Sequence, residues 1–134
     1  MAGTVVDLLV GALLTIPVTV FLGNRDASAS LVGWVDAVVL TVYVVVPTGT
    51  VGRTLGKLAA GTRVVRADGG HPVGIPRALV RWLVLAGPAV LPGLPGWAEV
   101  LAVTWAAVVA FPVLTDAHRR GRHDRAAGTV VVLT

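Results

Sequence analysis

The sequence predicts an all-α membrane protein with four transmembrane helices in two helical hairpins, a short interfacial helix and a small cytoplasmic β-hairpin or sheet. Three observations carry this prediction. Of the 134 residues, 55% are hydrophobic and only 13% are charged, whereas soluble domains have about 25% charged residues. The apolar residues gather in four long runs. Every Lys and Arg except Arg25 falls in the segments that such a hairpin pair places on one side of the membrane.

The four apolar runs are the predicted spanning helices. They cover residues 5–22, 31–48, 78–94 and 97–115. A spanning helix needs roughly 17–25 mostly apolar residues, and these runs lack the sustained polar stripe of a helix that faces water. The alternative is a soluble bundle of four buried helices, but the linkers hold too few polar residues to cover such a bundle. We therefore interpret residues 1–134 as a single membrane domain.

The positive charges predict the orientation of this domain. They gather in residues 49–76 and 116–134 and at the start of the third run. Because basic segments stay on the cytoplasmic side, we expect a multi-pass protein of the cell (inner) membrane with both termini in the cytoplasm. Anionic lipid headgroups then explain the basic excess. Nucleic acid is not an expected partner, since no aromatic residues alternate with the arginines.

The first cytoplasmic segment, residues 49–76, predicts a helix and a hairpin. Residues 51–60 read as a short helix along the membrane surface, with Arg53 and Lys57 on one face. Residues 62–67 resemble a strand and are followed by the turn sequence Asp-Gly-Gly. The returning strand would be residues 71–75, as an edge strand because it contains proline.

The last residues of the chain give a second strand signal. Residues 129–134 read TVVVLT, which is rich in β-branched residues and too short to span a membrane as a helix. The simplest arrangement pairs this segment with residues 62–67. We therefore expect a small cytoplasmic sheet packed against the helices.

Four charged residues interrupt the apolar runs: Asp7, Asp36, Arg81 and Glu99. A charge at the centre of a spanning helix costs about 2.5–3.5 kcal/mol, so each needs a partner or a function. With both termini inside, Asp7 and Arg81 lie near the inner boundary and could form a pair, either structural or part of a transport site. Asp36 and Glu99 lie near the outer boundary, where two acids could hold a proton or a cation. Glu99 could instead simply reach the headgroup water.

Other chemistry finds little support in the residues present. The chain has no Cys, which excludes thiolate sites. The spacing of His118 and His123 is not a standard zinc pattern, and the arginines between them repel cations. We expect no metal, no cofactor and no enzymatic activity, because no nucleophile–base pair can be assembled. Asp124 is expected to accept hydrogen bonds from nearby arginines or backbone N–H groups and so to fix the tail.

The two cytoplasmic segments resemble those of a known family. The first reads Gly52-x-Thr54-x-Gly56-Lys57, then Gly61-x-Arg63-Val64-Val65-x-x-Asp68-Gly69 and Arg77-Ala78-Leu79. The tail reads Arg119-Arg120-Gly121-x-His123-Asp124-Arg125-x-Ala127-Gly128-Thr129-Val130-Val131. Both are similar to motifs of the RDD family of bacterial membrane proteins, and the resemblance covers nearly the whole chain.

The resemblance implies roles for particular residues. The family is named for one arginine and two aspartates: Asp7 stands at the place of the first aspartate and Asp124 at that of the second. No arginine precedes Asp7 in this chain, which departs from the family pattern. The motif also implies structural or functional roles for Gly52, Thr54, Gly56, Lys57, His123, Asp124, Gly128 and Thr129.

Two functions follow as hypotheses. The resemblance implies transport, so the first is a small transporter or transporter subunit that exchanges a monovalent cation for protons. One copy offers a thin bundle, so we expect a homo-oligomer. The second is a membrane scaffold that does not transport and whose basic cytoplasmic face binds anionic lipid or a partner protein. The first hypothesis predicts that Asp36→Asn impairs function by reducing transport, whereas the second predicts that this variant is tolerated.

Overall fold

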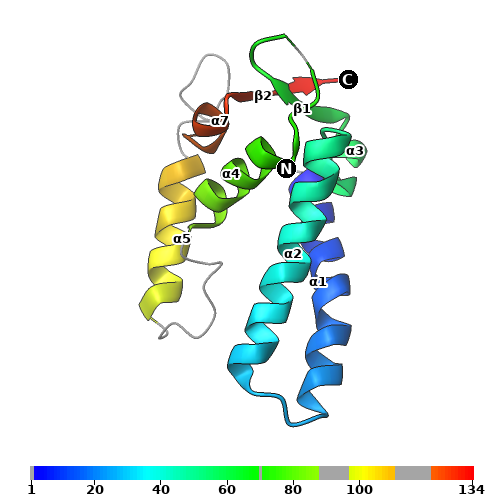
Figure 1. Ribbon diagram of the computed structural model, residues 1–134, viewed down its shortest axis with the longest axis vertical. Helices are drawn as coiled ribbons and strands as arrows, with labels where there is room; N and C mark the ends of the chain where they lie inside the picture. Colours follow the sequence, from blue (N-terminus) through cyan, green and yellow to red (C-terminus); the bar gives the residue numbers. More distant parts are fainter. Residues whose placement is uncertain (1, 70, 88–96, 111–121) are drawn as a thin grey trace.

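The computed structural model describes residues 2–69, 71–87, 97–110 and 122–134. The described part is mostly helical with one two-stranded sheet (Figure 1). Its elements, in chain order, are α1 (Ala2–Gly23), α2 (Ala29–Thr50), α3 (Leu55–Ala59), β1 (Thr62–Arg66), α4 (Ile75–Ala86), α5 (Trp97–Ala110), α7 (Arg122–Ala127) and β2 (Thr129–Leu133).

The helices α1 and α2 form a long antiparallel pair, which Figure 1 shows side by side. Each has 22 residues and is therefore about 33 Å long, close to the thickness of the hydrocarbon core of a bilayer, about 30 Å. Their stretches Val5–Gly23 and Ala29–Thr50 are long and apolar enough to cross a membrane. Many of their leucines and valines are exposed, as lipid-facing side chains would be. The first two predicted spans are thus found as long apolar helices.

The third and fourth predicted spans are not found as spanning helices. Residues 78–94 do not form one helix, because α4 ends at Ala86 and Gly87 leaves the helical conformation with φ 49° and ψ −130°. With 12 residues, α4 is only about 18 Å long, and it crosses α2 obliquely rather than running along it (Figure 1). The helix α5 has 14 residues. The remaining residues of both predicted spans, 88–96 and 111–115, lie outside the described residues.

The sheet confirms one prediction and corrects another. The strand β1 pairs antiparallel with β2, with Val64 opposite Val131, so the chain end closes onto the first strand as expected. The predicted returning strand is wrong, because residues 71–74 have no regular structure. A hydrogen bond from the Arg66 N–H to the His71 carbonyl, 3.1 Å long, closes the turn, and Pro72 has no N–H with which to extend the pairing.

The predicted helix over residues 51–60 is shorter than expected. Only Leu55–Ala59 is helical, because Gly52 adopts φ 79°, outside the right-handed helical region. Arg53 therefore precedes α3 and does not share a helical face with Lys57, contrary to our prediction. The turn at Gly52 is useful to the fold, since its carbonyl accepts a 2.6 Å hydrogen bond from the N–H of Val64 in β1.

Replacing Gly52 with Ala is expected to lower the free energy of unfolding by more than about 1–3 kcal/mol, the usual cost of a strained backbone conformation. The added Cβ would lie 2.5 Å from the carbonyl oxygen of Val64, so overlap adds to the strain. Gly128→Ala is the matched control, because Gly128 also has a positive φ, 63°, but an added Cβ there would contact nothing within 4 Å. Thermal unfolding in detergent measures both. Equal losses would show that the contact with Val64 has no role.

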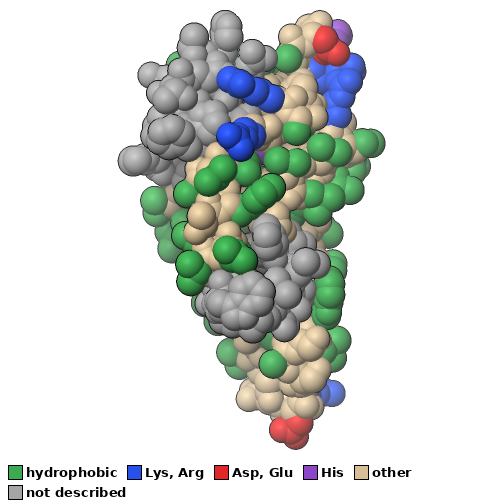
Figure 2. Space-filling view, turned by 90° about the vertical axis from the view of Figure 1, so that its left-hand side faces the viewer, with side chains coloured by type: hydrophobic (Ala, Val, Ile, Leu, Met, Phe, Trp, Pro, Cys, Tyr) green, Lys and Arg blue, Asp and Glu red, His purple; other side chains and the backbone are tan. Residues whose placement is uncertain are grey.

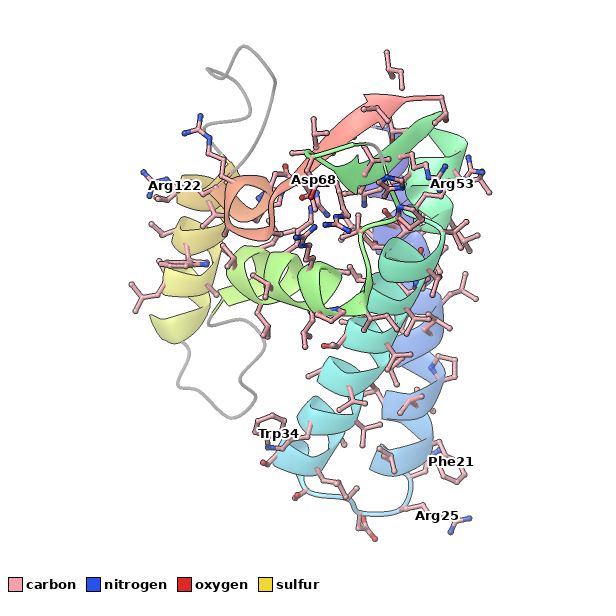
Figure 3. All side chains as sticks on the ribbon, turned by 45° about the horizontal axis from the view of Figure 1, so that its top comes forward. Phe21, Arg25, Trp34, Arg53, Asp68 and Arg122 are labelled. Carbon is pink, nitrogen blue, oxygen red and sulfur yellow. The ribbon has the colours of Figure 1, made fainter. Side chains whose placement is uncertain are left out.

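Charged side chains lie at both ends of the long axis of the molecule. Figure 3 shows Arg25 at the turn between α1 and α2, and Arg53, Asp68 and Arg122 at the opposite end. The guanidinium carbon of Arg25 lies 4.8 Å from the centre of the Phe21 ring. That opposite end also holds the start of α1 and the β1–β2 sheet. A small apolar core joins it together, where Val45, Val64, Val73, Ala78 and the partly buried Trp82 pack. We call the end of the molecule that holds the start of α1 and the β1–β2 sheet the sheet end.

Candidate functional site

The carboxylate of Asp7 is the centre of a junction between three helices at the sheet end. Its Oδ1 accepts hydrogen bonds from the Tyr43 hydroxyl at 2.7 Å and the Gly56 N–H at 2.9 Å. Its Oδ2 accepts one from the Thr54 hydroxyl at 2.7 Å. Asp7 belongs to α1, Tyr43 to α2, and Thr54 and Gly56 to the start of α3. One charged side chain therefore holds these helices together.

This junction explains how so short a helix as α3 begins. Thr54 is its N-cap residue but makes no side-chain capping bond. Its hydroxyl donates to Asp7 instead. The N–H group of Gly56, which a capping side chain would normally satisfy, is bonded by Asp7 instead. A residue 49 positions earlier in the chain thus caps α3, and the negative charge suits the positive end of the helix.

Lys57 lies beside this junction and is weakly held. Its Nζ is 3.9 Å from Asp7 Oδ2 and donates a 3.4 Å hydrogen bond to the Thr54 hydroxyl oxygen. Burial lowers the pKa of Lys57, and the nearby positive charge of Arg81 lowers this pKa further, against the opposing effects of Asp7 and Asp124.

A second buried carboxylate, that of Asp124, joins α4 to α7 and β2. The Nε of Arg81 donates a 2.6 Å hydrogen bond to Asp124 Oδ1, and the two side chains are only 9% and 2% exposed. His123 Nε2 lies 3.2 Å from Oδ2, and the Thr129 hydroxyl lies 3.2 Å from Oδ1. Burial alone would raise the pKa of Asp124, but His123 and Arg81 outweigh burial and hold this pKa far below its usual range.

The predicted pair between Asp7 and Arg81 is wrong. The two residues lie at the same end of the molecule, but each has another partner: Asp7 contacts α2 and α3, and Arg81 faces α7. The cause is the short, oblique α4, which turns Arg81 towards the chain end rather than towards α1. The prediction that Asp124 accepts a hydrogen bond from an arginine is confirmed, with Arg81 as the donor.

A cavity of about 470 Å³ lies between α1, α2 and α4. Asp7 and Arg81 both line it, so the structure brings these two predicted residues to one cavity without pairing them. The other lining residues are Leu8, Gly11, Ala12, Thr15, Leu40, Tyr43, Val44, Thr54, Lys57, Trp82 and Leu85. The cavity has the size of ligand pockets in proteins, roughly 300–1,000 Å³.

Asp36 lies at the other end of the helix pair, in α2. Its Oδ2 accepts a 2.9 Å hydrogen bond from the Thr19 hydroxyl of α1. Its Oδ1 is buried and has no hydrogen-bond partner among the described residues. Glu99 belongs to α5, but its side chain lies outside the described part of the structure. The proximity of Asp36 and Glu99 therefore stays a prediction.

The motif residues separate into the two carboxylate networks. Thr54, Gly56 and Lys57 surround Asp7, with Gly52 in the preceding turn. Arg81, His123 and Thr129 surround Asp124, and Gly128 supplies the turn between α7 and β2 with φ 63°. Among the described residues no group of three or more His, Asp or Glu could hold a metal ion.

Sequence reasoning missed Tyr43, which donates to Asp7, and Trp82, which lines the cavity and donates a 3.0 Å hydrogen bond to Thr41. A signal for Tyr43 was present, because it is the only Tyr of the chain and interrupts an otherwise apolar span. The place of Trp82 on the cavity wall follows from the direction of α4.

Comparison with known proteins gives one match. The model of the RDD family matches residues 1–128. No curated protein and no solved structure matches the chain. The matched range includes the Asp7 junction and His123 and Asp124 of the second network.

Proposed function

The chain belongs to the RDD family, and from this premise we propose that it is a transporter or transporter subunit that exchanges a monovalent cation for protons. Such a function needs a carboxyl group within the membrane that can hold a proton and a cation in turn. Asp36 fits this need best. It lies within the candidate span Ala29–Thr50, where an unused ionisable group would only cost free energy.

The observation that carries the proposal is the unpartnered Oδ1 of Asp36, buried between α1 and α2. In the part of the chain that the structure describes, Asp36 is bonded to the Thr19 hydroxyl, whose oxygen is also a suitable ligand for a hard monovalent cation. Asp7 differs, because an N–H group and an ammonium group lie against it as well as two hydroxyls. We therefore assign exchange to Asp36 and a structural role to Asp7.

The proposal includes an assembly and an orientation. A single copy leaves most of the apolar side chains of α1 and α2 exposed, and packing of several copies would enclose a pathway beside Asp36. The sheet end carries the basic residues, whereas Arg25 marks the opposite end. Basic segments favour the cytoplasmic side, so we propose that the sheet end and both termini lie in the cytoplasm of the cell.

Ion flux in proteoliposomes tests this proposal. Purified protein is reconstituted under a pH gradient, and sodium, lithium or potassium is added. The expected result is that the cation collapses the gradient with the wild-type protein, and that Asp36→Asn lowers the rate to that of liposomes without protein. Asn keeps the size of the side chain and its bond to Thr19 but cannot carry the charge.

The matched control is Asp26→Asn, which makes the same chemical change at an exposed residue in the turn after α1. Asp26→Asn should transport at the wild-type rate. Flux that is unchanged in Asp36→Asn would reject Asp36 as the exchange site. No flux with any cation, from folded and inserted wild-type protein, would reject exchange by the isolated protein.

A second candidate function is a scaffold that binds anionic lipid or a partner protein and does not transport. The observation in its favour is the gathering of basic residues at the sheet end, around β1, α4 and α7 (Figures 2 and 3). Arg53, Arg63, Arg77, Arg122 and Arg125 all have side chains that reach the surface there. The scaffold predicts that Asp36→Asn has no effect on function, so the flux experiment separates the two.

A further inference from the structure

The cavity between α1, α2 and α4 changes from polar to apolar along its length. At the level where α1 begins, Asp7, Tyr43, Thr54, Lys57 and Arg81 line it. Further along the helices, its walls are mostly apolar and include Ala12 and Leu40, while the hydroxyl of Thr15 is bonded to the Gly11 carbonyl. The residues that line it on α1 run from Asp7 to Thr15, a length of about 12 Å.

This gradient has the same direction as the polarity of a bilayer leaflet. The polar part lies at the sheet end, where the candidate span Val5–Gly23 begins, and the apolar part runs towards the middle of the span. Exposed apolar residues on both long helices, such as Leu9 and Val42, place lipid around this pair. A lipid that enters the cavity from the side would have its headgroup and its chain at matching depths.

The polar part of the cavity contains one weakly paired cation, Lys57. Two cations, Lys57 and Arg81, and one carboxylate, Asp7, line it. The carboxylate of Asp124 neutralises Arg81, with 2.6 Å between Oδ1 and Nε. Asp7 already accepts three short hydrogen bonds. Lys57 is left with a 3.9 Å contact to Asp7 and a 3.4 Å bond to Thr54, and its side chain is 22% exposed.

We propose that this cavity binds one anionic phospholipid, with the headgroup phosphate at Lys57 and an acyl chain along the apolar wall. The phosphate would give Lys57 the charge-assisted hydrogen bonds that Asp7 does not supply. The pKa of Lys57 is lowered by burial and by the charge of Arg81, and an anion beside the ammonium group would favour its charged form. The site lies at the opposite end of the helix pair from Asp36, so the inference does not rest on cation exchange.

Native mass spectrometry of the full chain in detergent tests the proposal. The protein is equilibrated with equal amounts of phosphatidylglycerol and phosphatidylcholine that carry the same acyl chains, and the bound lipid is measured. The wild-type protein is expected to retain one phosphatidylglycerol in preference to phosphatidylcholine. Lys57→Gln is expected to reduce that preference roughly tenfold, the effect of losing one hydrogen bond to a charged group.

Two variants give the matched controls. Arg53→Gln removes the same charge at the same end of the molecule, four residues away but outside the cavity lining, and should keep the preference. Lys57→Arg should keep it as well, because the charge remains. Ala12→Phe fills the apolar part of the cavity with another apolar side chain and is expected to reduce the binding of both lipids.

Several results would overturn the proposal. Equal effects of Lys57→Gln and Arg53→Gln would show that the whole basic face, and not the cavity, selects the lipid. Unchanged lipid binding by Ala12→Phe would show that no acyl chain occupies the cavity. Adducts with the mass of a free fatty acid, in place of a phospholipid, would show that a different amphiphile occupies the cavity. Thermal unfolding in detergent confirms that each variant compared is folded.

Discussion

Replacing Asp124 with Asn is expected to lower the free energy of unfolding by about 3–5 kcal/mol, the usual cost of removing one partner from a buried ion pair. The guanidinium of Arg81 would keep its burial but lose the carboxylate that lies 2.6 Å from its Nε. His123 and Thr129 would lose their contact with the same charge. Thermal and denaturant unfolding in detergent measure the loss.

Asp68→Asn is the control for this variant. Asp68 also pairs with an arginine, Arg66, at 2.8 Å, but its side chain is 56% exposed. Surface ion pairs contribute little to stability, so the unfolding temperature of Asp68→Asn should equal that of the wild type. An Asp124→Asn protein as stable as Asp68→Asn would show that the buried pair does not hold α4 to α7.

The apolar double variant Arg81→Met with Asp124→Leu separates the pair from its burial. Removing both charges leaves neither one buried alone, and such replacements are often neutral. We expect the double variant to be more stable than Asp124→Asn. A double variant that is less stable than Asp124→Asn would show that Arg81 makes an essential contact besides Asp124.

The same network predicts how stability depends on pH. The pKa of Asp124 in the folded protein lies well below the ordinary value of 3.8. The ionised carboxylate therefore contributes its full stabilisation above about pH 4, and this contribution is lost as the pH falls through the folded-state pKa. The difference in stability between wild type and Asp124→Asn should shrink below pH 4. A difference that stays constant down to pH 2 would contradict this.

Some of the architecture could be predicted because it depends on local pattern. The runs over residues 5–22 and 31–48 became α1 and α2 with nearly the same bounds, since a long apolar run has few alternatives to a helix when it lies in lipid. The pairing of β1 with β2 could be predicted for a similar reason, because TVVVL suits a strand and needs a partner.

Other features could not be predicted because they depend on direction in space. Hydropathy does not register the change of backbone at Gly87, which ends α4 and turns Arg81 towards Asp124. For the same reason the partner of Asp7 was misassigned: two residues at equal depth in a membrane need not face each other. Tyr43 reaches Asp7 because α2 packs against α1, and Lys57 reaches it because α3 packs against α1.

Replacing Asp7 with Ala is expected to have the second large effect, a loss of roughly 3 kcal/mol in the free energy of unfolding. A hydrogen bond to a charged group contributes about 1.5–3 kcal/mol, and Asp7 accepts three of them, which do not add fully because they share one carboxylate. Tyr43→Phe removes only one donor and should lose less than Asp7→Ala. Unfolding in detergent measures both variants.

Amide hydrogen exchange tests where this loss acts. Without Asp7 the N–H of Gly56 has no acceptor in the junction, and a helix of five residues cannot stay formed alone, so exchange should increase across α3 before the whole protein unfolds. Asp36→Asn is the matched control, because Asp36 also bonds α1 to α2 but lies at the far end. It should leave exchange in α3 unchanged. If Asp7→Ala also left it unchanged, packing of α3 against α1, rather than the carboxylate, would hold α3 in place.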